Sequence, residues 1–180
     1  MATPEWQARI VALVEIKEAM SSLDKERLWD YRLPEVAASP TLLARAEQAL
    51  GRPFDTAHRR FLEAAGGWPA FWHTVDLMTP AQLVSSSHRE RAEGLLRALD
   101  AEVLDGHGLE REQLQPVAVA TDDTDLFLID RRTDPGPVLW FAGPLVDRFT
   151  EFDDFFVAMI EYHRRDLQEF AEEDRSPAGG

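Results

Sequence analysis

The run QPVAVATDDTDLFLIDRRTDPGPVLWFA, residues 115–142, decides the fold. It contains three β-prone stretches, PVAVA, DLFLID and PVLWFA, which are separated by the polar turns TDDT and RRTDPG. Short strands at this turn-to-turn spacing are typical of an antiparallel meander. Helical patterns flank the block on both sides. We therefore predict an α+β fold, in which an antiparallel sheet of about four to six strands is packed by helices, with one helix at each end of the chain.

Helix start signals outside this block place the main helices. An N-cap residue followed by proline predicts a helix start. This pair occurs at Thr3-Pro4, Ser39-Pro40 and Thr79-Pro80. We expect the helix after Pro80 to be polar and to run toward Leu104, and a long amphipathic helix to follow Phe149-Thr150.

The stretch between the first and third of these helices is less regular. A short helix is expected over 23–31, and another from Asp55 or Thr56 to Leu62, which Gly66-Gly67 would end. Trp68–Trp72 is then expected to form an aromatic turn that leads into a short strand over His73–Leu77.

Length and composition restrict the class of protein. The 180 residues suggest one domain over 1–170, with 1–38 as an N-terminal helical extension and 171–180 as a flexible tail. The absence of cysteine excludes disulfides and thiolate metal sites. No apolar run approaches ~18 residues, so no membrane span is expected. The N-terminus resembles no secretion signal, and we therefore expect a cytoplasmic protein.

The charge of the chain is unevenly distributed. Residues 1–99 carry 13 acidic and 12 basic side chains, whereas residues 100–180 carry 20 acidic and 7 basic ones. A strongly acidic half repels nucleic acid, which needs Lys and Arg to neutralise its phosphates. It attracts basic proteins and accelerates their encounter, although it also serves solubility alone. The charge therefore disfavours a nucleic-acid partner and leaves two roles open, solubility and attraction of a basic protein.

Few residues suggest chemistry. The turn Thr121–Asp125 is acidic, and three interpretations remain open: a hairpin turn, a loop that contacts a partner through Asp122, Asp123 and Asp125, or a Mg²⁺ or Ca²⁺ site of a metal-dependent hydrolase. The five histidines lack metal-ligand spacing, and Ser85–His88 lacks the glycine elbow of a serine hydrolase. We expect no enzyme activity, no cofactor and no metal.

The aromatic segment Trp68–Trp72 has two interpretations. Its two indoles either cover the core or form exposed anchors for a partner, since Trp is enriched among binding hot spots. Trp140 and Phe141 are neighbours in a predicted strand, so one ring should face inward and the other outward. Trp68 and Trp72 are candidate binding residues in addition to Asp122, Asp123 and Asp125.

The order of several short motifs resembles the SUKH superfamily. In AEQALGRPFDTAHRRFLEAAGG the matching positions are Glu47, Leu50-Gly51, Phe54, Phe61-Leu62 and Gly66-Gly67. The strand DLFLID matches through Asp125, Phe127 and Asp130, and PVLWFA with FTEFDDFFVAMI resembles the closing strand and last helix. The resemblance covers about residues 40–162. The chain departs from the family pattern at Asp55, His58, Ala65 and Thr124.

This resemblance implies an α+β fold without enzyme activity. Bacterial members resemble immunity proteins, which bind and neutralise a cognate toxin domain, often a nuclease, whereas a yeast member regulates cell-wall synthesis. Our leading hypothesis is therefore an immunity protein that occludes one basic toxin domain. The alternative is a regulatory or scaffold module that binds an endogenous protein.

Overall fold

Residues 3–175, which the computed structural model describes, contain a six-stranded antiparallel sheet. Its strands follow chain order as a meander, each hydrogen-bonded to the next. They are β1 (Trp68–Trp72), β2 (Val75–Leu77), β3 (Leu114–Ala120), β4 (Asp125–Asp130), β5 (Val138–Ala142) and β6 (Leu145–Phe149). The predicted α+β class and antiparallel sheet are confirmed.

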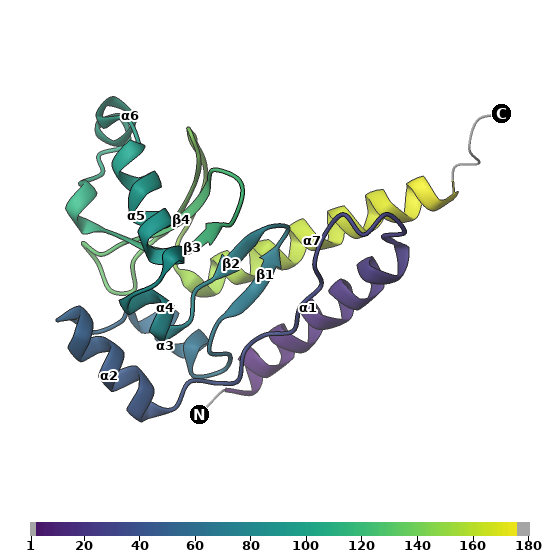
Figure 1. Cartoon of the computed structure of the whole chain (residues 1–180), viewed down its shortest axis with the longest axis horizontal. Coiled ribbons are helices and arrows are strands. Elements are labelled where there is room, and N and C mark those ends of the chain that lie inside the picture. Colours follow the sequence, from purple (N-terminus) through teal and green to yellow (C-terminus); the bar gives the residue numbers. More distant parts are fainter. Residues whose placement is uncertain (1–2, 176–180) are drawn as a thin grey trace.

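Helices cover both faces of this sheet. The described residues form α1 (Pro4–Leu23), α2 (Pro40–Leu50), α3 (Thr56–Leu62), α4 (Pro80–Val84), α5 (Ser87–Ala98), α6 (Ala101–Gly106) and α7 (Phe152–Arg175), with a 3-10 turn, η1 (Arg111–Gln113). The long helices α1 and α7 run side by side, and α5 packs against β3 and β4 (Figure 1). With both faces covered, Trp140 and Phe141 are both buried, so the expectation that one ring faces outward is wrong.

The segment Trp68–Trp72 is a strand rather than the predicted turn. It forms β1 at the edge of the sheet, and β2 begins only at Val75. Pro69 lacks the N–H of a central strand, but an edge strand tolerates proline because one of its sides is unpaired. Pro116 in the interior strand β3 coincides with a register shift between Pro116 and Ala118, which accommodates the missing N–H.

Side-chain caps also alter two predicted helices. The expected helix over 23–31 does not form, because the Asp24 carboxylate instead accepts hydrogen bonds from the backbone N–H groups of Leu28 and Trp29. The predicted polar helix from Pro80 toward Leu104 is divided into α4, α5 and α6. Ser86 and Asp100 cause the breaks, since each side chain captures a backbone N–H at the start of the next helix.

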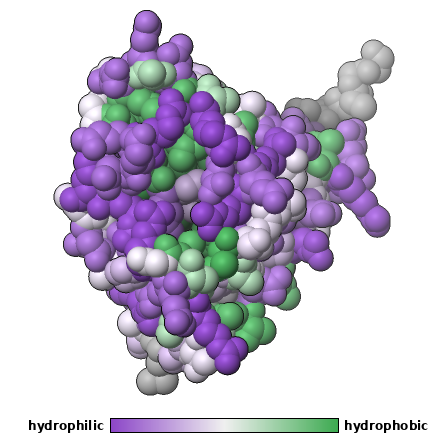
Figure 2. Space-filling view, turned by 60° about the vertical axis from the view of Figure 1, so that its left-hand side comes forward, coloured by the Kyte–Doolittle hydropathy of each residue, from purple (hydrophilic) through white to green (hydrophobic). Residues whose placement is uncertain are grey.

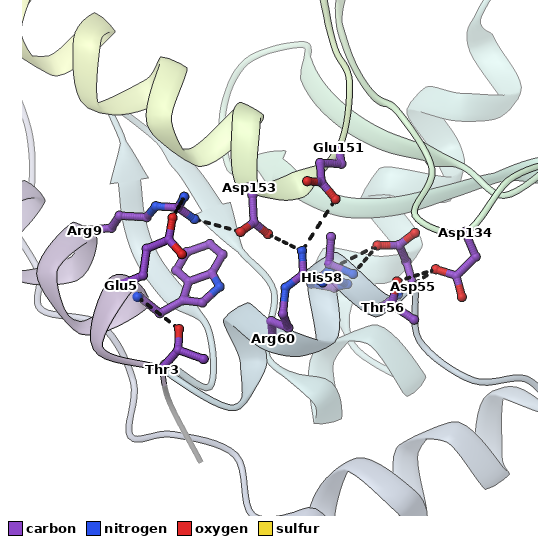
Figure 3. A network of polar contacts seen from close by, with 12 residues as sticks. Thr3, Glu5, Arg9, Asp55, Thr56, His58, Arg60, Asp134, Glu151 and Asp153 are labelled. Atoms are coloured by element: carbon purple, nitrogen blue, oxygen red, sulfur yellow. Dashed lines mark hydrogen bonds and ion pairs between the residues drawn. The ribbon is translucent and has the colours of Figure 1, made fainter.

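The start of α7 is fixed by ion pairs to two other helices (Figure 3). Asp153 accepts from Arg9 of α1 at 2.8 Å and from Arg60 of α3 at 3.0 Å. On the other side of α3, the Asp134 carboxylate accepts from the backbone N–H of Thr56 at 2.8 Å. The two ion pairs of Asp153 thereby join the start of α7 to α1 and α3.

The backbone at Gly66 explains one motif position. A Cβ atom on Gly66 would lie 2.3 Å from the carbonyl oxygen of Val36, so only glycine fits. Glu47 of the same motif accepts from the Phe54 N–H at 3.0 Å and from Arg59 at 2.5 Å. The motif residues therefore hold α2, α3 and the segment before α2 together.

One face of the molecule is mainly polar. Figure 2 shows that hydrophilic side chains predominate on this face, with smaller hydrophobic patches between them.

The C-terminal helix is longer than expected. Helix α7 continues to Arg175, so residues 171–175 of the predicted tail are helical, while 176–180 lie outside the described residues. None of the helices within residues 3–175 has the length and hydropathy that a transmembrane span requires.

Candidate binding site at one end of the sheet

Three hairpin turns meet at one end of the sheet. In a meander the β1–β2, β3–β4 and β5–β6 turns share an end, and the N–H of Thr121 joins the first two by donating to the carbonyl of Thr74 at 2.9 Å. Helix α7 passes this end, and near its middle the Tyr162 hydroxyl donates to Asp147 of β6 at 3.3 Å. Residues far apart in sequence are thereby collected at one place.

Four neighbouring rings, three of them stacked and the fourth edge-on, form what we call the aromatic ladder: Trp29, His73, Trp72 and Trp140. The His73 ring lies between the indoles of Trp29 and Trp72, with centroids 4.2 Å apart on each side. Trp72 then meets Trp140 edge-on at 5.0 Å. The backbone of His73 is held at φ +50, an unfavourable conformation for a non-glycine residue, which directs its ring between the two indoles. The ladder connects the segment after α1 with the core.

Carboxylates accept the polar hydrogens of this ladder. Asp166 Oδ2 lies 2.9 Å from His73 Nε2 and accepts from Trp72 Nε1 at 3.2 Å, while Asp125 accepts from Trp140 Nε1 at 2.6 Å. Burial raises the pKa of Asp166, but His73 and Trp72 outweigh it, and the net pKa is lowered. Burial likewise raises the pKa of Asp125, which the bond from Trp140 offsets only in part.

Two buried basic side chains contact backbone carbonyl groups of β1. The Lys17 ammonium donates to the carbonyls of Ala70 and Phe71, and Nε2 of His163 lies 2.8 Å from the same Phe71 oxygen. Burial lowers the pKa of Lys17 to about 8 against the attraction of Asp76, and it lowers the pKa of His163 to about 4. These contacts fix the strand from which Trp72 projects.

The structure separates the predicted site residues. Trp72 is half-buried in the ladder, and Asp125 accepts a hydrogen bond from Trp140 of the same ladder. Asp122 and Asp123 are exposed on the adjoining turn. Trp68 is 0% exposed, and its indole N–H donates to the carbonyl of Arg32 at 2.8 Å. Trp68 therefore belongs to the core, and its prediction as an exposed anchor is wrong.

The acidic turn is organised as a hairpin. Asp123 accepts from the N–H of Thr124 at 2.7 Å, and Arg91 donates to the carbonyls of Ala120 and Asp123 at 2.6 Å. Within residues 3–175 no three His, Asp or Glu side chains converge as a metal site would require. Among the same described residues, no Lys, Arg or His forms an ion pair with the Asp122 carboxylate.

The sequence pattern missed three residues of this site. Trp29 falls in the segment expected to be helical, and His73 pairs with Asp166, which lies 93 positions later. Asp76, which is closer to His73 in the sequence, contacts His88 at 2.8 Å. No local spacing indicates a pairing between β1 and α7. A cavity of about 360 Å³ beside the ladder, lined among others by Arg27, is also formed only by the fold.

This end of the sheet combines aromatic rings with clustered carboxylates. No family model and no curated protein matches the chain. The geometry alone therefore indicates its chemistry: exposed negative charge beside half-buried indoles is an arrangement that suits binding of a positively charged protein surface.

Proposed function

We propose that this chain is an immunity protein that neutralises a cognate bacterial toxin domain by stoichiometric binding in the cytoplasm. The toxin domain would be basic, as nucleases commonly are because they bind phosphate. The observation that carries the proposal is the juxtaposition of the exposed Asp122 and Asp123 with the aromatic ladder at one end of the sheet. The SUKH resemblance supplies the class of function and stays a prediction.

Electrostatics supports a basic partner. The C-terminal 81 residues carry 20 acids against 7 bases, and this region provides the acidic turn and α7. Opposite charge raises association rates and suppresses wrong partners. The carboxylates of Asp122 and Asp123 are exposed, so they are available for steering without disturbing the core.

Aromatic contact would then provide the lifetime of the complex. Trp29 and Trp72 are half-buried and already held by stacking on His73, so little side-chain freedom is lost on binding. In this mechanism the chain steers the toxin domain with Asp122 and Asp123 and occludes its active surface. No catalytic step and no cofactor takes part.

Capture followed by a toxicity assay tests the proposal. The tagged chain is used as bait in an extract of its native host at low and high salt, and bound proteins are identified by mass spectrometry. We expect one stoichiometric basic protein that high salt releases. Expressed alone it should arrest growth, and co-expression of this chain should restore growth. A captured protein that is harmless alone, such as a component of wall synthesis, would contradict the proposal and favour a regulatory module.

A further inference from the structure

The last turns of α7 and the segment after α1 enclose a groove. Two adjoining cavities of about 400 and 200 Å³ lie between them, and Leu28, Phe170 and Glu173 line both. Figure 1 shows the end of α7 projecting beyond the sheet, with α1 and the following segment alongside. We call this hollow the α7 groove. It begins next to the aromatic ladder, because Trp29, His73 and Asp166 line its inner end.

The lining of the groove includes four large apolar side chains. They are Leu23, Leu28, Trp29 and Phe170. Leu28 is 55% exposed, although a leucine gains free energy when it is removed from water. The groove therefore offers uncovered hydrophobic contact area to another molecule.

The rim of the groove is acidic. Six of its lining residues are carboxylates, and Lys25 is the one Lys or Arg among them. Lys25 is already paired with Asp174. By contrast, the carboxylates of Glu26, Glu169 and Glu173 have no ion-pair or hydrogen-bond partner within residues 3–175. Three uncompensated carboxylates thus surround the apolar lining.

The groove is held in shape before any ligand arrives. The Asp24 carboxylate holds the segment after α1 in place. It accepts hydrogen bonds from the backbone N–H groups of Leu28 at 3.0 Å and Trp29 at 3.2 Å, and from the Tyr31 hydroxyl at 2.9 Å. Burial raises the pKa of Asp24, but these bonds outweigh it and keep the net pKa below its ordinary value. Stacking of Trp29 on His73 fixes the inner end. Such preorganisation reduces the entropy lost on binding.

We propose that the α7 groove docks a cationic amphipathic segment of the protein partner. Apolar side chains of that segment would pack on Leu28 and Phe170, and its arginines would pair with Glu169 and Glu173. Arginine suits this rim because its guanidinium pairs with carboxylates and stacks on aromatic rings such as Trp29. The inference rests on the proposed function and adds to it the chemistry of the contacting segment.

A designed peptide tests the groove without the natural partner. The probe is a helical peptide with arginine on one face and leucine on the other, titrated into the full chain by calorimetry and Trp fluorescence. Glu169→Lys/Glu173→Lys and, separately, Leu28→Ser should each weaken its binding about tenfold or more, a loss of ~1.4 kcal/mol. The matched control Glu102→Lys/Asp105→Lys changes the net charge equally on the distant helix α6 and should leave the affinity within about twofold.

Two sets of outcomes separate this inference from the immunity proposal. The groove proposal would be overturned if the peptide did not bind, or if the control Glu102→Lys/Asp105→Lys weakened peptide binding as much as the groove variants do. It would also be overturned if Leu28→Ser, with an unchanged circular dichroism spectrum, bound the peptide with wild-type affinity. If a captured toxin domain bound the groove variants and the wild type with equal affinity, the groove proposal would be overturned while the immunity function would stand. Peptide binding in the groove together with a captured partner that is harmless would instead contradict the immunity function.

Discussion

His58 makes the stability of this protein depend on pH. Its ring on α3 is fully enclosed by aromatic side chains, with the Phe152 centroid at 4.8 Å and Phe54 at 5.9 Å (Figure 3 shows its position beside Asp55). Neither ring nitrogen has a hydrogen-bond partner in the described part of the chain. Burial, with a smaller contribution from Arg131, lowers the pKa of His58 from 6.5 to about 3.

The sign and size of the effect follow from this shift. Below pH 6.5 the unfolded chain binds a proton at His58 while the folded chain does not, so the free energy of unfolding falls as the pH falls toward 3. Each pH unit in this window costs about 1.4 kcal/mol. Between about pH 7.5 and about pH 5 the loss due to His58 is therefore about 2 kcal/mol. His163, whose pKa is lowered to about 4, adds a similar loss.

His58→Phe isolates the first contribution. Phenylalanine keeps the ring packing and cannot be protonated, so urea denaturation of the variant should lose about 2 kcal/mol less than the wild type over the same pH range. The exposed His107 provides the control, and His107→Gln should behave as the wild type. An equal pH dependence in wild type and His58→Phe would refute a neutral, buried His58.

Three further predictions concern packing and the segment that borders the groove. Gly66→Ala should lower the free energy of unfolding by more than about 1 kcal/mol, because the added Cβ would collide with the carbonyl oxygen of Val36. Gly94→Ala should instead raise the free energy of unfolding by about 0.5–1 kcal/mol in the same denaturation assay, because Gly94 lies in α5 with open space around it. Trp68→Ala should cost about 3–5 kcal/mol, as deletion of a fully buried indole does; a loss below about 1 kcal/mol would contradict its burial. Asp24→Asn should accelerate amide hydrogen exchange at Leu28 and Trp29 and leave that of β4 unchanged; equal protection in both proteins would contradict the role of Asp24.

The three central strands were predictable from the sequence because each is a short run of mostly apolar residues between polar turns. PVAVA, DLFLID and PVLWFA became β3, β4 and β5 because their turns and hydrophobic residues agree with the sheet. The edge strand β1 was missed, since Trp68-Pro69 favours a turn when the neighbouring strand is unknown. Helix breaks at Ser86 and Asp100 depend on single side-chain caps that compete with helix continuation.

The candidate site was only partly predictable. Composition indicated an acidic surface, and Trp72 with Asp125 lies where aromatic and acidic residues meet. The central pairing of His73 with Asp166 joins β1 to α7, and such long-range contacts leave no trace in local spacing. The burial of Trp68 likewise depends on Arg32 and the helices above it rather than on its own segment.

The association rate of the captured partner tests the central claim most directly. Stopped-flow fluorescence would compare the wild type with Asp122→Lys/Asp123→Lys and with the matched control Glu102→Lys/Asp105→Lys, over a series of salt concentrations. We expect the wild-type rate to fall with salt and the Asp122/Asp123 variant to associate about tenfold more slowly at low salt, with the control unchanged. Equal rates for all three proteins, or a wild-type rate independent of salt, would contradict recognition of a basic partner by this acidic end of the sheet.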